Sequence, residues 1–313
     1  MQNKLSTAGF FILVVTLLLT ACTTNPHVTG PDKSIHTMDK ETSDLADVTA
    51  DALQLIERTD RKNILVVFDI DNTILAMEQG LGSDSWYEWQ KNLSEEDPCN
   101  PHYVGDRFAA QGALYFASAM RRTQEDGADQ VRAIQDQGLK VIALTARGMD
   151  YQLQTFRELR RNNFSFSYSA IGPAGGYIDA FVPVENGRPS LYEDGVFLTA
   201  GQHKGQMLLA LLEKTDTPMP VVIVMVDDKQ KNLDAIKETF SALGIPVHSW
   251  RYTGEDQNVR DFNPDQADQL WTTIADPLRE VQQALGPDNY DLSGAVPPPE
   301  CDQPLSSSPV SGD

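Results

Sequence analysis

Three short apolar runs constrain the fold of this chain more than any other feature. They cover residues 64–68, 141–144 and 221–226, and each is rich in β-branched side chains. Runs of this length and composition are typical of strands buried on both faces, which occur in parallel sheets covered by helices. The sequence therefore predicts an α/β fold with a Rossmann-like parallel sheet and helices on both faces.

Segments with helical periodicity lie between and after these runs. The predicted helices cover about residues 39–60, 125–137, 149–162, 203–214 and 229–243, and a last helix opens at Asn263-Pro264. Turn signals at Asn186-Gly187 and Asp194-Gly195 separate three short segments. These segments, 181–184, 190–192 and 196–199, predict a small antiparallel meander. Residues 78–118 leave room for a small helical lid.

The N-terminal 21 residues have the pattern of a secretory signal peptide, because Lys4 precedes an apolar run and small residues follow it. The ending Leu19-Thr20-Ala21-Cys22 resembles the bacterial lipoprotein signal, in which cleavage before the cysteine is coupled to its acylation. The resemblance implies a protein that is lipid-anchored at Cys22 to a bacterial membrane, in the periplasm or at the cell surface. Thr23, where inner-membrane lipoproteins usually carry Asp, favours the outer membrane.

Four parts of the chain follow from this. Residues 1–21 are the signal peptide, 22–38 a polar tether, 39–285 the folded domain, and 286–313 a disordered tail rich in Pro and Ser. If Cys22 is acylated, Cys99 and Cys301 remain as a pair in an oxidising compartment. They form either a disulfide bond or two unpaired thiols.

Composition excludes one class of function. The chain has 45 acidic and 25 basic residues and a formal net charge of -20. Phosphate backbones bind proteins through Lys and Arg, so a nucleic-acid partner is not expected. No feature of the sequence identifies a protein partner.

Acids and a hydroxyl follow the three apolar runs directly. Asp69 and Asp71 come after the first run, Thr145 follows the second, and Asp227 and Asp228 follow the third. Ligands of open α/β sheets bind at the carboxyl ends of the strands, so we expect these side chains to share one crevice. Crowded carboxylates favour a bound hard cation, and an oxygen-rich set suits Mg²⁺. Zn²⁺ is not expected, because no His pair at ligand spacing accompanies the acids.

The sequences FDIDNT, ALTARG and MVDD, with a Lys between the last two, resemble the four motifs of the haloacid dehalogenase-like (HAD) superfamily over roughly residues 60–255. Together with the lipid anchor, they are also similar to the HAD-type acid phosphatases of bacterial surfaces. The FDIDNT motif, a Ser-Asp-Ser-Trp-Tyr stretch and the meander further resemble a poorly characterised branch of secreted HAD-like proteins.

The resemblance implies a role for each acid. Asp69 is the nucleophile that becomes an aspartyl phosphate, and Asp71 is the acid and base that serves the leaving oxygen and then water. Mg²⁺ is held by the carboxylates of Asp69 and Asp227 and the main-chain carbonyl of Asp71, while Asp228 acts through water. Thr145 donates its hydroxyl and adjacent N–H groups to the phosphoryl oxygens.

The lysine of the third motif has no fixed spacing from the others. Lys204 is our choice, because it starts the helix before the third apolar run, and Arg147 and Lys229 are rivals. Asn232 either orients Asp228 or a metal-bound water, or is a surface amide. Candidates for substrate binding are Asn72, Arg147 and Trp86, although Trp86 also fits the core of a lid.

Two functions are compatible with these observations. The first is a Mg²⁺-dependent phosphomonoester phosphatase that works outside the cytoplasm through an aspartyl phosphate, with a small phosphomonoester as substrate. The second is a non-catalytic HAD-like lipoprotein that binds at surfaces. The intact acids favour the phosphatase, since a scaffold without turnover need not keep them. No Gly-x-Ser-x-Gly, Walker or His-Glu-x-x-His motif indicates another chemistry.

Overall fold

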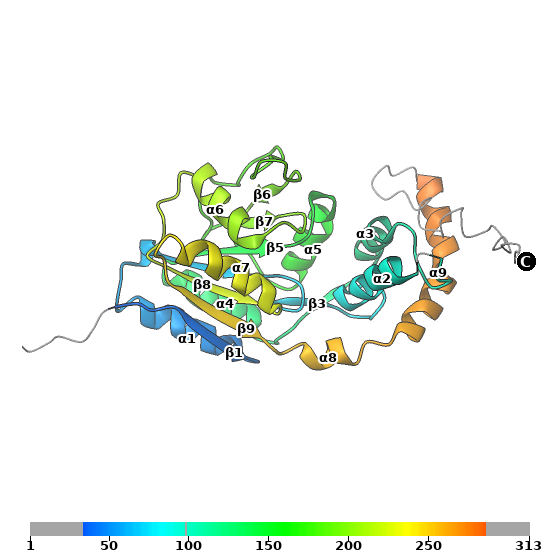
Figure 1. Ribbon diagram of the computed structural model, residues 1–313, viewed down its shortest axis with the longest axis horizontal. Coiled ribbons are helices and arrows are strands. Elements are labelled where there is room, and N and C mark those ends of the chain that lie inside the picture. The colour runs from blue at the N-terminus through cyan, green and yellow to red at the C-terminus, as the bar shows by residue number, and fades with distance from the viewer. Residues whose placement is uncertain (1–33, 98, 286–313) are drawn as a thin grey trace, which may run out of the picture. The chain divides into compact units, whose positions relative to one another are not determined.

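A seven-stranded sheet lies at the centre of the fold (Figure 1). The computed structural model describes residues 34–97 and 99–285. The strand order is β1-β9-β8-β2-β5-β7-β6, and neighbouring strands are parallel except β6 and β7. The strands are β1 (Met38–Thr42), β2 (Ile64–Phe68), β5 (Lys140–Thr145), β6 (Leu191–Glu193), β7 (Val196–Leu198), β8 (Val222–Asp227) and β9 (Val247–Tyr252). The predicted α/β fold class is confirmed.

The three apolar runs form β2, β5 and β8, with β2 between the other two. Successive side chains of a strand point to opposite faces, so each run supplies two cores. Val66 and Phe68 belong to one apolar cluster with the helices α1, α4 and α5. Leu65 and Val67 belong to a second cluster with α6 and α7. The helices are α1 (Leu45–Leu55), α4 (Gly127–Asp136), α5 (Gln152–Arg161), α6 (Lys204–Lys214) and α7 (Gln230–Ser241).

The N-terminal part of the domain differs from its prediction. Residues 39–60 were expected to be one helix, but β1 pairs with β9 before α1 begins. Asp44 causes the break, because its extended backbone and its side-chain bond to the N–H of Ala46 form an N-cap. Ile35 and Met38 pack against the core, so the last residues of the expected tether belong to the domain.

The predicted meander is only partly correct. Its second and third segments form β6 and β7, which pair antiparallel, but β7 also pairs with β5 and joins the large sheet. The first segment contributes a single bridge, between Phe181 and Ser190, and no strand. The turn signals were therefore right, and β7 in addition extends the main sheet.

A helical lid is present between β3 (Leu75–Met77) and β4 (Met120–Arg122), which pair antiparallel where the chain leaves and re-enters the core. It contains α2 (Asp84–Glu96) and α3 (Arg107–Ala117). The helix α9 (Pro264–Leu285), reached through α8 (Asp256–Arg260), completes it. Their shared core consists of Leu81, Trp86, Val104, Ala110, Ala113, Leu114, Ala267, Trp271 and Ala275. The lid therefore combines two distant segments of the chain.

The signal peptide, Cys22, Cys301 and the C-terminal tail lie outside the described residues. Cys99 is disulfide-bonded, and the other two cysteines of the chain are among the residues not described. The Cys99–Cys301 pairing therefore stays a prediction. Within 34–97 and 99–285, no helix has the length and apolarity needed to cross a membrane.

We expect Trp86→Ala to destabilise the lid. The Trp86 side chain is 0% exposed and lies 6.4 Å, between ring centroids, from Trp271 of α9. Removing a buried Trp side chain typically costs about 3–5 kcal/mol. Chemical denaturation measures this loss, with half-buried Trp89→Ala as the matched control on the same helix. Equal losses for both variants would contradict a lid core built on Trp86.

Candidate active site

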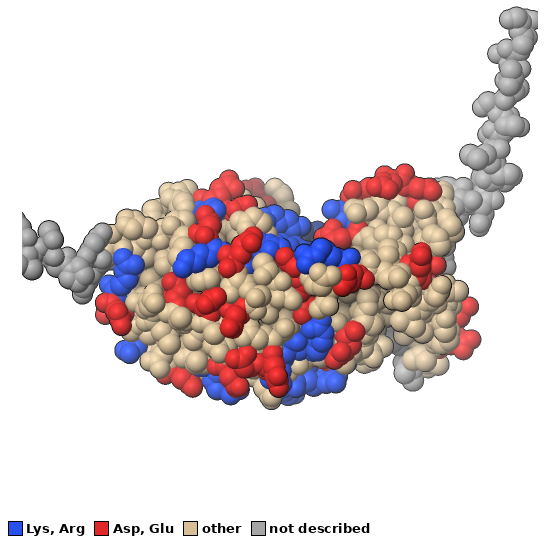
Figure 2. Space-filling view, turned by 90° about the horizontal axis from the view of Figure 1, so that it is seen from below, with Lys and Arg blue, Asp and Glu red and all other residues tan. Residues whose placement is uncertain are grey.

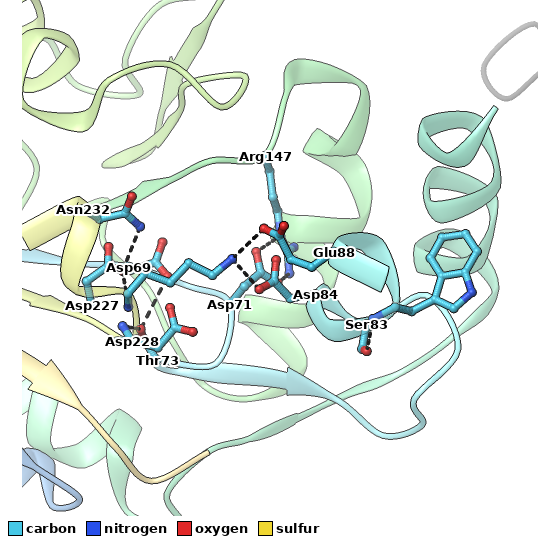
Figure 3. A network of polar contacts seen from close by, with 12 residues as sticks. Asp69, Asp71, Thr73, Ser83, Asp84, Glu88, Arg147, Asp227, Asp228 and Asn232 are labelled. Atoms are coloured by element: carbon cyan, nitrogen blue, oxygen red, sulfur yellow. Dashed lines mark hydrogen bonds and ion pairs between the residues drawn. The ribbon is translucent and has the colours of Figure 1, made fainter. Parts of the chain in front are cut away.

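Three carboxylates meet at the carboxyl ends of β2 and β8 (Figure 3). Asp69 follows β2, and its N–H donates to the carbonyl of Val226 on β8 at 2.9 Å. Asp227 ends β8 and Asp228 follows it. One oxygen of each of these three Asp residues lies within 4.8 Å of the others. Asp69 is 5% exposed and Asp227 0%, so the parallel pairing of two buried strands assembles an acidic cluster inside the protein.

Lys204 is the lysine that contacts these acids. Its Nζ lies 2.6 Å from Asp69 Oδ1 and 2.6 Å from Asp227 Oδ2, and its side chain is 2% exposed. Burial would lower the pKa of Lys204, but Asp227 and Asp69 outweigh it and raise the pKa, so the amine is a cation. Gly205 allows this placement, since a Cβ there would lie 2.2 Å from the carbonyl oxygen of Ala235 on α7.

Two further side chains hold the cluster in place. Thr73 Oγ1 accepts from the N–H of Asp228 at 3.0 Å and donates to Asp69 Oδ2 at 3.4 Å. Asn232 Nδ2 donates to Asp227 Oδ1 at 2.8 Å. Asn232 was expected to orient Asp228 or a metal-bound water, or to be a surface amide. In the structure its amide holds Asp227 and not Asp228, and the role toward a metal-bound water stays a prediction. Thr73 was visible in the FDIDNT motif but received no role.

The electrostatics of the cluster favour a bound cation. Burial, with smaller contributions from neighbouring carboxylates, raises the pKa of Asp69 to about 7 although Lys204 opposes it. Burial and the charges of Asp69 and Asp227 raise the pKa of Asp228 to about 9. A hard divalent cation coordinated by oxygen atoms would relieve this repulsion. The donor set of Asp69, Asp227 and Asp228 therefore fits such an ion.

We expect Mg²⁺ to stabilise the protein more as the pH rises. Because Asp69 and Asp228 bind protons more tightly in the folded than in the unfolded chain, their stabilisation is present at low pH. It is lost as the pH rises through about 7 and about 9. A cation that needs both groups ionised should offset that loss, by about 2.7 kcal/mol at one hundred times its Kd. Thermal unfolding with Mg²⁺ or chelator, across this pH range, measures the difference. A pH-independent effect of Mg²⁺ would contradict binding at these carboxylates.

Asp71 lies beside the cluster and is held by Arg147. Arg147 Nε and a terminal nitrogen donate to the two Asp71 oxygens at 2.9 and 2.8 Å. Tyr115 of α3 donates to Asp71 Oδ1 at 3.3 Å, and the Arg147 guanidinium lies 4.7 Å from the centre of the Tyr115 ring. Burial would raise the pKa of Asp71, but Arg147 more than compensates and lowers it. Asp71 is therefore ionised in this structure.

The Arg147 side chain is engaged inside the protein, and its contact with a substrate stays a prediction. Its side chain is 3% exposed, and besides Asp71 it donates to Thr155 Oγ1 at 2.8 Å. Trp86 is likewise buried in the core of the lid. Neither residue lines the cavity beside the acids, whereas Asn72 does. Asn72 adopts a φ of 57°, in the left-handed region, at the turn after β2.

Thr145 ends β5 next to β2, as predicted. It is completely buried, and its Oγ1 accepts from the N–H of Arg147 at 3.2 Å. Lys229, a rival for the third-motif lysine, instead contacts the lid. Its Nζ lies 2.6 Å from Asp84 Oδ2 and 3.4 Å from Glu88 Oε1, both on α2. Asp84, Glu88 and Tyr115 were missed, because only the folded lid brings them to the site.

Comparison with known proteins places the chain in a family. Residues 41–280 match the family described as "Protein of unknown function (DUF2608)", and the chain belongs to it. The match begins within β1 and covers the rest of the sheet, α2 and α3 of the lid, and most of α9. No curated protein shows significant similarity to the chain.

Proposed function

We propose that this protein is a Mg²⁺-dependent phosphomonoester phosphatase of the HAD type. It would be held to a membrane by a lipid anchor at Cys22 and would act outside the cytoplasm. The observation that carries the proposal is the position of Asp69. It lies at the end of a central strand, beside a buried lysine and two further carboxylates. This is the arrangement that an aspartate nucleophile for phosphoryl transfer requires.

In the proposed reaction, a carboxylate oxygen of Asp69 attacks phosphorus while the bond to the leaving oxygen breaks. Lys204 holds Asp69 Oδ1 and neutralises part of the charge, and the Thr145 hydroxyl donates to a phosphoryl oxygen. Asp69, Asp227 and Asp228 would hold the cation. The main-chain carbonyl of Asp71 would be a further ligand, as the resemblance implies. When bound, Mg²⁺ would supply charge neutralisation at the phosphoryl oxygens.

Asp71 would act twice. It would first give a proton to the leaving oxygen, and then take one from the water that hydrolyses the aspartyl phosphate. Its ionised state in the structure suits the second role directly, because a base must be unprotonated. For the first role, the carboxyl must release Arg147 and take up a proton from solvent before it can donate one to the leaving oxygen. Substrate binding beneath the lid is the step at which that exchange would occur.

The test is hydrolysis of a panel of phosphomonoesters by the full chain, with Mg²⁺ and with excess chelator. We expect turnover that depends on Mg²⁺. Undiminished activity in chelator would remove the metal from the mechanism. No turnover of any ester, in a folded protein that still binds Mg²⁺, would instead favour the non-catalytic, surface-binding lipoprotein.

A further inference from the structure

A cavity of about 460 Å³ adjoins the acidic cluster. The cluster side of its wall includes Asp228 and Lys229, and the lid side includes Glu88 and Trp89 of α2. The volume lies within the range of roughly 300–1,000 Å³ that is usual for small-molecule sites. Because Asp228 belongs both to the cluster and to the cavity wall, a phosphoryl group bound at the cluster would have its organic part in this cavity.

The basic side chains of the wall are already neutralised. Lys229 pairs with Asp84 at 2.6 Å and with Glu88 at 3.4 Å. Arg251 pairs with Asp256 at 2.9 Å, and all five of these residues line the cavity. A second anionic group on a ligand would have to displace these carboxylates and would lie close to them. Figure 2 shows acidic and basic side chains interspersed over the face that it presents.

Aromatic side chains form the apolar part of the wall. Trp89 of α2 and Phe262, between α8 and α9, have ring centroids 6.1 Å apart and an interplanar angle of 56°. Both rings are half-buried and both line the cavity. Such rings pack against apolar groups and attract cations to their faces. The wall therefore offers aromatic rings for apolar contact. Its carboxylates also outnumber its two basic side chains, Lys229 and Arg251.

We propose that this cavity binds the organic part of the substrate, and that this part is apolar or aromatic and carries an amine or no charge, never a second anionic group. The proposal rests on the phosphatase function and narrows its substrate class. Monophosphates of neutral or amine-bearing alcohols belong to that class. Polyphosphates, bisphosphates and phosphorylated carboxylic acids do not.

Three aryl phosphates that differ mainly in charge test the proposal. They carry a 2-aminoethyl, a 2-hydroxyethyl or a carboxymethyl group para to the phosphate. With the full chain and Mg²⁺, we expect kcat/KM to be about tenfold higher for the amine than for the carboxylate, with the alcohol between them. Glu88→Gln should reduce this ratio several-fold. Glu95→Gln, the same change on the exposed end of α2, is the matched control and should leave it unchanged.

Calorimetric titration with tyramine, tyrosol and 4-hydroxyphenylacetate, which lack phosphate, separates this proposal from the phosphatase function. Preferred binding of the amine, weakened by Glu88→Gln and by Trp89→Leu, would support the cavity even if no ester were hydrolysed. Hydrolysis of all three esters with equal kcat/KM, or a preference for the carboxylate, would overturn the proposal while leaving the phosphatase intact.

Discussion

Asp69→Asn should lower kcat for an aryl phosphate by on the order of 10⁶-fold, the size of loss seen when a hydrolase loses its covalent nucleophile. Asn keeps the shape of the side chain but cannot form the aspartyl phosphate. It also removes one of the three carboxylates proposed to hold Mg²⁺. Steady-state kinetics with Mg²⁺ in excess measure the loss, and excess Mg²⁺ should not restore it.

The control for this variant is its stability. The pKa of the Asp69 carboxyl is raised by burial, so a neutral amide is well tolerated there and the thermal midpoint should not fall. Asp234→Asn, on the exposed face of α7, should leave both stability and kcat close to the wild-type values. Wild-type activity in Asp69→Asn would exclude the aspartyl intermediate.

Asp71→Asn should show the second large effect, and the loss should depend on the leaving group. General acid help is typically worth about 10²–10⁴ in rate, and an alkoxide needs it where a nitrophenolate does not. We therefore expect the phosphorylation of Asp69 to slow much more with alkyl phosphates than with activated aryl phosphates. Single-turnover measurements with both substrates test this and can detect an acyl phosphate that accumulates on Asp69.

The variant Arg147→Met is the comparison needed to interpret the result for Asp71→Asn. Asp71 and Arg147 form a bidentate pair in which Arg147 is buried and Asp71 is half-buried. Removing one partner of a fully buried pair typically costs about 3–5 kcal/mol, which is an upper bound here. Arg147→Met should therefore destabilise the fold while keeping the Asp71 carboxyl. If Asp71→Asn and Arg147→Met slow both substrates equally, Asp71 only supports the geometry of the site, and the acid must be another group.

The polar residues at the ends of the central strands could be predicted from the sequence, because each directly follows an apolar run along the chain. A short, buried run that is rich in β-branched residues is typical of a central strand. The residue that follows such a strand lies at its end whatever the rest of the chain does. The strand ends therefore carry Asp69, Thr145 and Asp227 as expected. Lys204, which was chosen as the lysine of the third motif because it starts the helix before the third run, contacts Asp69 and Asp227.

Tertiary structure alone decided how the remaining residues are used. Arg147 is bound to Asp71, 76 positions away along the chain, because β5 pairs with β2 in the sheet. Lys229 is bound to a lid helix, and these partners meet only when the lid packs over the sheet. Trp86 was ambiguous until α9, nearly 180 residues later, supplied Trp271 against it. Side-chain roles of this kind depend on burial and on distant partners, whereas local sequence specifies only the strand or helix that presents each group.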